Sequence, residues 1–368
     1  MGLPDIVIEF SRKAVAAIQS GTLGVVGIIL KDDKNNGAMI LRGVDEIPTG
    51  DSAFSAANTA YIQRAFIGAP TKVIVYTLPQ DAEDYNEAFK YFATQRVHYM
   101  VGAPDISTDE AKLFATWIKG LRAKSIRRPV AVLPNTAEDD RSVVNFSVVN
   151  YSSTDKIMEG ETAYTEAEYC SRIAGLLAGV DLRISATFKP LSELTQIPSA
   201  DDEEVDAAID AGKLVLYSDG ERIVIGRGVN SLVTTTTTEV NTEDLKKIKI
   251  SAIQDLIEGD IYSTINSSYI GNYSNSYDNK CLLITAIRGY LRGLEATDGG
   301  KDYLRANSST MEINVAKQKL YLESIGIDTS EMSEQEIKEA NTGSHVFLKG
   351  TISILDAIED VDIFINKE

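Results

Sequence analysis

The chain has 368 residues, and 36 Lys and Arg against 54 Asp and Glu give it a formal net charge of −18. A hydrophobic fraction of 43% with 24% charged residues is typical of a folded chain and excludes a wholly disordered protein. So acidic a chain repels phosphates, which argues against nucleic acid and anionic membranes as partners. No window reaches the roughly 18 consecutive apolar residues of a membrane span. The length predicts two or three domains.

The first part of the chain reads as a terminal strand followed by a small β-rich unit. Ile6, Ile8 and Phe10 alternate with other residues and give the terminal strand one apolar face. The expected elements, in chain order, are strands over 5–10, 22–30 and 38–41, a helix that begins at Asp51 or Ser52 and ends near Ile67, and a strand over 71–78.

The middle of the chain alternates strands with helices, which predicts βαβ units and a mainly parallel sheet. Two helix starts are marked by capping boxes, in which a hydroxyl and a carboxylate three residues apart satisfy each other's free backbone N–H groups. These boxes are 107–110 and 165–168. The expected elements are helices from Asp81 to about Thr94, behind 107–110 and behind 165–168, and strands over 96–101, 129–133 and 141–150.

The last part mixes helices with short strands. An acidic run opens a short helix that ends at Gly212, and two strands with a tight turn between them predict a hairpin. The expected elements are strands over 213–217, 221–225, 234–238 and 345–355, helices over 242–265, 277–296, 314–324 and 334–340, and a final strand in which Val361, Ile363 and Ile365 alternate with polar residues.

Catalytic chemistry finds little support in the sequence. The two histidines, His98 and His345, lie far apart, and no spacing typical of metal ligands is present. The glycine-rich run 21–27 lacks the dinucleotide-binding pattern and precedes a strand instead of following one. Ser52 is better placed as a helix cap than as a nucleophile. We therefore propose no catalytic, metal-binding or cofactor-binding residues and expect no cofactor.

Apolar alternating strands at both chain ends are unusual, because chain ends normally fray. An unpaired apolar strand promotes aggregation unless a partner covers it. Either the two terminal strands pair within their own subunit, or they add to sheets of neighbouring subunits through main-chain hydrogen bonds.

Several segments, taken in order, resemble contractile tail sheath proteins of myovirus-type phages and phage-tail-like bacteriocins, in particular the short type with few insertions. The resemblance covers nearly the whole chain and rests on the order and spacing of the segments. They are 3–6, 21–27, 65–73, 213–229, 269–273, 281–284, 341–348 and 355–360. The chain departs from the family pattern at 226–228, where many relatives carry an aromatic residue.

The resemblance implies a mixed α/β and α+β fold with a central subtilisin-like α/β domain that lacks the catalytic residues. The divisions we expect are an N-terminal arm over 1–20, a small β-rich domain over 21–90, the central domain over 91–238, a C-terminal α+β domain over 239–355 and a C-terminal arm over 356–368.

The resemblance also implies a structural role. Such proteins stack as hexameric rings around a tail tube and contract to drive the tube through a cell envelope, and their arms donate strands to neighbouring subunits. The implied partners are further copies of the chain, the tube protein, and baseplate and tail-terminator proteins, with assembly in the cytoplasm of a bacterial host. The alternatives are an α/β enzyme, either a hydrolase or nucleotide-using, and another structural tail protein.

By position, Ile6, Ile8 and Phe10 would form the N-terminal arm, and Val361, Ile363 and Ile365 the C-terminal arm. A helix in the region that begins near residue 277 faces the tube in the family. On that helix Lys280, Arg288 and Arg292 form a basic stripe on an acidic protein, and we expect this stripe to contact the tube.

Overall fold

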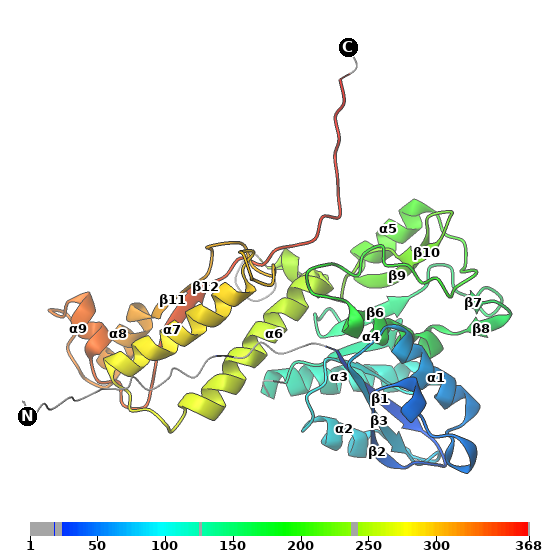
Figure 1. Ribbon diagram of the computed structural model, residues 1–368, viewed down its shortest axis with the longest axis horizontal. Coiled ribbons are helices and arrows are strands. Elements are labelled where there is room, and N and C mark those ends of the chain that lie inside the picture. Colours follow the sequence, from blue (N-terminus) through cyan, green and yellow to red (C-terminus); the bar gives the residue numbers. More distant parts are fainter. Residues whose placement is uncertain (1–17, 19–23, 125–126, 237–241, 367–368) are drawn as a thin grey trace, which may run out of the picture. The chain divides into compact units, whose positions relative to one another are not determined.

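The apolar runs between residues 24 and 225 form one mixed sheet in the computed structural model, which describes residue 18 and residues 24–124, 127–236 and 242–366. Eight strands of the described residues lie in the order β10-β9-β6-β5-β4-β1-β3-β2 (Figure 1). The strands from β9 to β3 pair in parallel, whereas β10 and β2 pair antiparallel at the two edges. The strands are β1 (Val25–Lys31), β2 (Gly37–Leu41), β3 (Lys72–Leu78), β4 (Tyr99–Val101), β5 (Val130–Pro134), β6 (Val143–Ser147), β9 (Lys213–Ser218) and β10 (Ile223–Ile225).

Helices cover both faces of this sheet, because its inner strands are apolar on both sides. In β1, Val26 and Ile28 join the core under α1 and α4, whereas Val25 and Ile29 join the core under α2 and α3. The helices of this part are α1 (Ala56–Ile67), α2 (Asn86–Phe92), α3 (Thr108–Lys124), α4 (Glu166–Gly179) and α5 (Asp202–Asp210). A hairpin of β7 (Ile157–Glu159) and β8 (Thr162–Tyr164) stands apart from the sheet.

The helices α1 and α4 approach each other closely enough to exclude side chains at their crossing. A Cβ atom on Gly175 would lie 1.9 Å from the carbonyl oxygen of Ala65, and one on Gly179 would lie 1.7 Å from that of Gly68. Glycine is therefore required at these positions by backbone contact. This crossing fixes α4, most of which is buried, against the sheet.

The two edges of the sheet differ. Beside β10, the backbone N–H of Phe188 donates to Ile225 O at 2.8 Å, and that of Leu191 donates to Ile223 O at 2.9 Å. Along β2, the described residues supply backbone partners only from β3, and Ile40 on this strand is 42% exposed. One edge is thus covered by the chain and the other is open.

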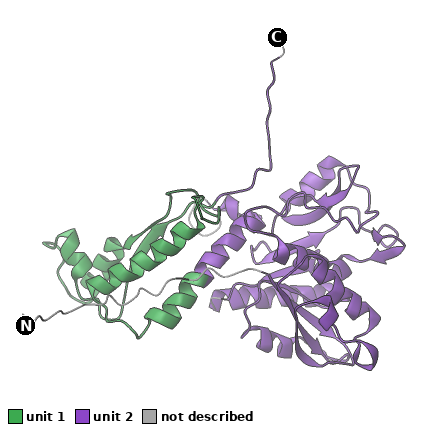
Figure 2. Ribbon diagram, viewed as in Figure 1, with its two compact units in different colours: residues 1–20, 260–354 green, residues 21–259, 355–368 purple. Residues whose placement is uncertain are grey.

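The described chain divides into two compact units (Figure 2). Unit 2 contains residues 24–259 and 355–366, and unit 1 contains residues 260–354 together with residue 18. The helix α6 (Ile248–Thr264) contributes residues to both units. Strands from the expected domains 21–90 and 91–238 lie in one continuous sheet, in which β1 lies between β3 and β4. The described residues of the expected C-terminal arm, 356–366, group with unit 2.

Unit 1 is built around α7 (Tyr277–Leu294), whose apolar stripe packs on a two-stranded antiparallel sheet. Leu283, Ile287, Tyr290 and Leu294 are buried members of that stripe. The other elements are β11 (Thr310–Ile313), α8 (Val315–Ser324), α9 (Glu334–Glu339) and β12 (Leu348–Thr351). Short helical turns elsewhere are η1 (Val44–Glu46), η2 (Gly50–Ser52), η3 (Glu243–Lys246) and the π-helical η4 (Ile265–Tyr269), which continues α6.

The mixed α/β class is confirmed, with local differences. The cap of α1 is Ser55, not Asp51 or Ser52, because those two residues lie in the preceding turn η2. Residues 234–236 form no strand, and 237–238 lie outside the described residues. The hydrogen bonds of both predicted capping boxes of unit 2 are present.

Candidate functional site

Open α/β sheets bind ligands beyond the carboxyl ends of their strands, at the point where the connections diverge to opposite sides. In unit 2 this point lies between β1 and β4, since β3 flanks β1 on its other side. In this structure, hydrogen-bonded side chains of unit 2 occupy that ligand position. The buried Tyr61 hydroxyl donates to Gly102 O at 3.0 Å, and Asp32, 4% exposed, accepts from Ser55 N at 2.9 Å and Asn58 Nδ2 at 2.7 Å.

The charged groups near these strand ends have structural partners. Burial opposes ionisation of Asp32, but hydrogen bonds from Asn58 and from backbone N–H groups outweigh it and lower the pKa of this carboxyl. Lys31 Nζ forms an ion pair with Glu110 Oε1 at 2.9 Å. The usual ligand position of the fold is therefore a packed polar network.

The two histidines lie in different units, His98 in unit 2 and His345 in unit 1. His98 Nδ1 accepts the backbone N–H of Val25 at 3.2 Å, and burial, together with the charges of Arg96 and Lys72, lowers the pKa of His98 to about 4. His345 is exposed and lies 5.0 Å from Tyr321, ring centroid to ring centroid. No cluster of metal-ligating side chains occurs among the described residues.

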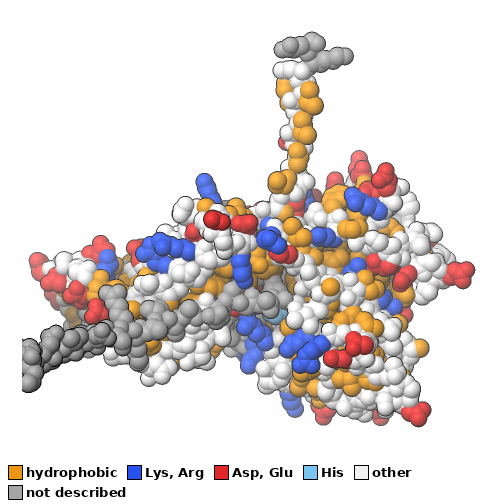
Figure 3. Space-filling view, viewed as in Figure 1, with side chains coloured by type: hydrophobic (Ala, Val, Ile, Leu, Met, Phe, Trp, Pro, Cys, Tyr) orange, Lys and Arg blue, Asp and Glu red, His pale blue; other side chains and the backbone are white. Residues whose placement is uncertain are grey.

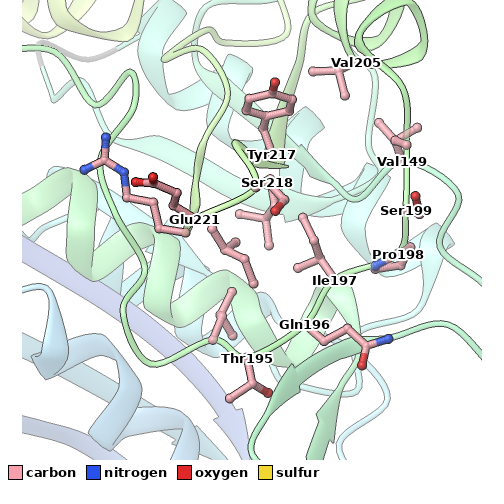
Figure 4. Close-up of a pocket in the computed structure, with 16 residues that line it drawn as sticks. Val149, Thr195, Gln196, Ile197, Pro198, Ser199, Val205, Tyr217, Ser218 and Glu221 are labelled. Carbon is pink, nitrogen blue, oxygen red and sulfur yellow. The ribbon is translucent and has the colours of Figure 1, made fainter.

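A pocket of about 470 Å³ opens beside β9 and β10 (Figure 4). Its lining includes Ser199 and Ser218, and no hydrogen bond between described residues joins either hydroxyl to a base. Arg222, at the rim, is held by Asp219 through an Nε–Oδ2 contact of 3.0 Å. The pocket therefore offers no activated nucleophile.

The C-terminal segment is exposed and apolar. Val361, Ile363 and Ile365, predicted as one face of an arm, are 65%, 76% and 82% exposed, and Phe364 between them is 88% exposed. Residues 361–366 form no strand with any described residue, and Figure 3 shows hydrophobic side chains along this segment away from the body of the chain. The N-terminal arm residues Ile6, Ile8 and Phe10 lie outside the described residues.

Just before this segment, three acidic residues contact unit 2. Thr187 Oγ1 donates to Glu359 Oε1 at 2.6 Å, and Arg227 Nη2 donates to Asp360 Oδ2 at 2.7 Å. Lys247 Nζ lies 3.0 Å from Glu359 Oε2 and also bonds Asp356. We call residues 355–360 the root and residues 361–366 the free segment. Sequence reasoning treated both as one arm.

The three residues of the predicted basic stripe on α7 differ in their exposure. Lys280 is 2% exposed and its Nζ donates to Lys338 O at 3.4 Å, so within unit 1 this side chain does not reach the surface. Its predicted place in the stripe needs correction, because the first turn of α7 is covered by the segment around α9. Arg288 and Arg292 are exposed, and each is followed by an exposed glycine, Gly289 or Gly293.

The two-stranded sheet of unit 1 is open on both sides. The strands β11 and β12 pair from Thr310 with Thr351 to Ile313 with Leu348, and each finds only the other as a strand partner among the described residues. A two-stranded sheet is marginally stable in water unless further strands or helices support it. Sequence reasoning missed β11, because its four residues, although they alternate between polar and apolar, are too few to give a strong strand signal.

Comparison with known proteins gives a consistent family. A family model for the phage tail sheath protein central domain matches residues 80–231. The tail sheath protein of Clostridium phage phiCD119 is 36% identical over 370 residues, which cover 98% of this chain and 98% of that protein.

Solved structures share the fold at low sequence identity. The sheath tail protein of Desulfitobacterium hafniense aligns with a TM-score of 0.68 at 15% identity, over 84% of this chain and 94% of that one. The helical sheath of the anti-feeding prophage in its contracted state aligns with a TM-score of 0.68 at 13% identity over 100% of both chains.

These similarities to sheath proteins agree with the packed polar network that occupies the usual ligand position between β1 and β4. None of the helices found in the described ranges has the length and apolar character needed to span a membrane. The expectation of a structural protein in the tail of a phage or phage-tail-like particle, and not an enzyme, is confirmed. The chain belongs to the phage tail sheath protein family.

Proposed function

We propose that this chain polymerises as stacked hexameric rings around a tail tube and that the rings contract to drive the tube through a cell envelope. The observation that carries the proposal is the free segment, an exposed apolar stretch that pairs as a strand with none of the described residues. The contracted state named for the anti-feeding prophage sheath supports contraction, and the baseplate of that particle, to which this chain also aligns with a TM-score of 0.63, supports a baseplate partner. Tail-terminator proteins are the remaining proposed partner.

Strand donation explains both the free segment and the open sheet of unit 1. An added strand satisfies backbone groups at an open edge, and its alternate side chains fix the register. The side chains of Val361, Ile363 and Ile365 would then be buried on a neighbouring copy. We propose β11–β12 of that copy as the acceptor, with Ile6, Ile8 and Phe10 as the second donated strand. Because each donated strand links one copy to another in a repeating way, the assembly grows as a filament.

The exposed face of α7 supports a contact with the tube. Gly289 and Gly293 each cost about 1 kcal/mol of helix stability relative to alanine. Neither glycine has a positive φ, and a Cβ atom at either would meet nothing within 4 Å. Glycine is therefore not required by unit 1 itself, and a smooth surface between Arg288 and Arg292 suits the close approach of an acidic partner. Lys280 would not contact the tube, and its hydrogen bond to Lys338 O would only help to hold α7 in place.

Electron microscopy of the purified chain tests polymerisation. Wild-type chain is expected to form striated cylinders, and the double substitution Ile363→Asp with Ile365→Asp is expected to leave dispersed particles. The matched control, Ile363→Val with Ile365→Val, keeps an apolar β-former at both positions and should form cylinders. Cylinders of normal length from the aspartate variant would overturn strand donation by the free segment.

Co-sedimentation with the tail tube protein of the same particle tests the second contact. Arg288→Glu with Arg292→Glu should reduce tube binding and leave cylinder formation unchanged. Lys317→Glu, an exposed charge reversal on α8, is the matched control and should bind the tube normally. Equal binding by both variants would contradict the assignment of α7.

A further inference from the structure

Near the end of the described chain, acidic residues that contact the rest of unit 2 are followed by exposed apolar residues. The side chain of Glu359 is 5% exposed, whereas Val361 is 65% exposed and the residues after it are exposed as well. The root is therefore docked on unit 2 and the free segment is not. Exposure alone does not distinguish the two parts, because Ile358 in the root is 89% exposed; the root differs by the contacts of Asp356, Glu359 and Asp360 with Thr187, Arg227 and Lys247, which we call the socket.

Contacts that do not involve the root hold the socket residues in place. The backbone N–H of Gly228 donates to Thr187 Oγ1 at 3.0 Å, so this hydroxyl is left to donate its own proton to Glu359. The backbone N–H of Thr187 donates to Ser185 Oγ at 3.1 Å and holds the turn. A Cβ atom at Gly228 would lie 3.3 Å from Ser185 Oγ, which leaves little room there for a larger residue.

The cations of the socket are placed side by side by backbone pairing. Val229 and Lys247 form an antiparallel bridge, and Ile248 N donates to Gly228 O at 2.9 Å. This brings Arg227 and Lys247 to the same carboxylate, since Arg227 Nε lies 3.7 Å and Lys247 Nζ 3.0 Å from Glu359 Oε2. The socket thus presents two cations and a hydroxyl to one buried acid.

The charges of the root and the socket stabilise each other. Burial opposes ionisation of Glu359, but hydrogen bonds from Thr187 and Lys247 outweigh it and lower the pKa of this carboxyl. Burial likewise opposes the charge of Lys247, and its hydrogen bonds to Asp356 and Glu359 outweigh it and raise the pKa of this amine. A buried acid of this kind is costly to leave without its partners.

We propose that Thr187, Arg227 and Lys247 form an anchoring socket for the acidic root, so that only the residues from Val361 onward are exchanged with a neighbouring copy. A force on the exchanged strand is then transmitted through the root to the sheet of unit 2. It does not pass through unit 1, although unit 1 directly precedes the root in the chain. The inference rests on the proposed strand donation for its role in the polymer, but root docking itself is a property of the single chain.

Spin labels on the full, unassembled chain test the docking. Cys281→Ser removes the half-buried thiol, and a label is placed on a cysteine substituted for Ile358, which is 89% exposed within the root, or for Ile363 in the free segment. We expect slow label motion at 358 and fast motion at 363. Glu359→Lys should raise the motion at 358 to that at 363, and adding Lys247→Glu should restore slow motion.

The matched control is Asp362→Lys, the same charge reversal beyond the root, which should leave the label at 358 slow. Equal mobility at 358 and 363 in the otherwise unchanged chain would overturn the socket. So would an unchanged spectrum in the Glu359→Lys variant.

Microscopy of assembled cylinders separates this inference from the proposed function. We expect Glu359→Lys cylinders to form and then to break into short stacks on contraction, because the strand remains donated but its anchor is lost. Glu359→Lys cylinders that contract intact would refute the anchoring role and leave strand donation standing. Normal cylinders from the aspartate variant of the free segment would refute strand donation, and the spin-label result would still decide the docking.

Discussion

Unit 2 and unit 1 differ in how far the faces and edges of their sheets are covered by residues of the same unit. Unit 2 covers both faces of its eight-stranded sheet with its own helices and closes one sheet edge with its own chain. In unit 1, each strand of the two-stranded sheet finds only the other as a strand partner among the described residues, and Ile270, Leu320 and Ile325 are among its exposed apolar side chains. Unit 2 thus covers both faces and one of the two edges of its sheet, whereas the described residues of unit 1 cover neither outer edge of its sheet.

The chain carries separate reporters for the two units. Its one tryptophan, Trp117, lies in α3 of unit 2, where it stacks on Phe89 at 4.3 Å between ring centroids. Cys170 is buried in α4 of unit 2, and Cys281 is half-buried in α7 of unit 1. Tryptophan fluorescence therefore follows unit 2, and the reaction rate of each thiol follows its own unit.

The largest effect is expected at the helix crossing of unit 2. Gly175→Ala places a Cβ atom 1.9 Å from Ala65 O, so α1 and α4 must separate, at a cost of more than about 4 kcal/mol. Urea unfolding followed by Trp117 fluorescence measures it. Gly120→Ala in α3, where a Cβ atom meets nothing within 4 Å, should instead stabilise by roughly 0.5–1 kcal/mol. Equal stability of the two variants would contradict the close packing of unit 2.

Acid should weaken unit 2 through His98. The pKa of His98 is about 4 in the folded chain against an ordinary value of 6.5, so between these values the unfolded chain binds more protons. Stability is therefore expected to fall by about 3 kcal/mol as the pH drops from 7 to 4, in addition to the effect of other groups. His98→Gln can still accept the N–H of Val25 and should show a shallower pH dependence of the urea midpoint. Parallel profiles would be inconsistent with a neutral buried imidazole.

Unit 1 should respond to loss of one buried hydrogen bond without a change in unit 2. Tyr290 Oη donates to Asp260 Oδ2 at 2.9 Å, and both side chains are buried. Tyr290→Phe should cost about 1–2 kcal/mol and speed the labelling of Cys281 roughly tenfold, with Cys170 unaffected. Tyr262→Phe, at a residue 47% exposed, is the control and should change neither rate. If both thiols became more reactive in Tyr290→Phe, the units would not open separately.

The smallest effect is expected on the exposed face of α7. Gly289→Ala should stabilise unit 1 by roughly 0.5–1 kcal/mol and slow the labelling of Cys281. If the tube approaches this face closely, the same variant should bind the tube more weakly. A variant that is more stable and binds the tube equally well would leave the glycine without a role in the contact.

Local sequence signals predicted a helix start where a capping box marks it. Ser107 with Glu110 and Thr165 with Glu168 form their expected capping boxes, because the signal and the contact lie within one turn. Without such a box, the cap of α1 was placed at Asp51 or Ser52 and lies at Ser55. The position of Lys280 could not be predicted, since its burial depends on the distant α9. The pairing of β1 with β4 could not be predicted for the same reason, because it joins segments about 70 residues apart in the sequence.

The arm residues Val361, Ile363 and Ile365 came from their alternation and from the family resemblance, and their role in a neighbouring copy stays a prediction. In the structure these side chains and Phe364 are all exposed. The root was not foreseen, because the partners of Glu359 lie at Thr187 and Lys247 and no local pattern links these positions.

The tight turn between β9 and β10 bears on how this protein could be engineered. Gly220 has a φ of +89° and open space around its Cα atom, and the turn links two strands that are paired through their own backbones. A fusion at the C-terminus would extend the free segment, whereas a peptide inserted at this turn would leave both the free segment and the root unchanged. A polymer of such chains would display the peptide once per subunit, at a regular spacing along its length.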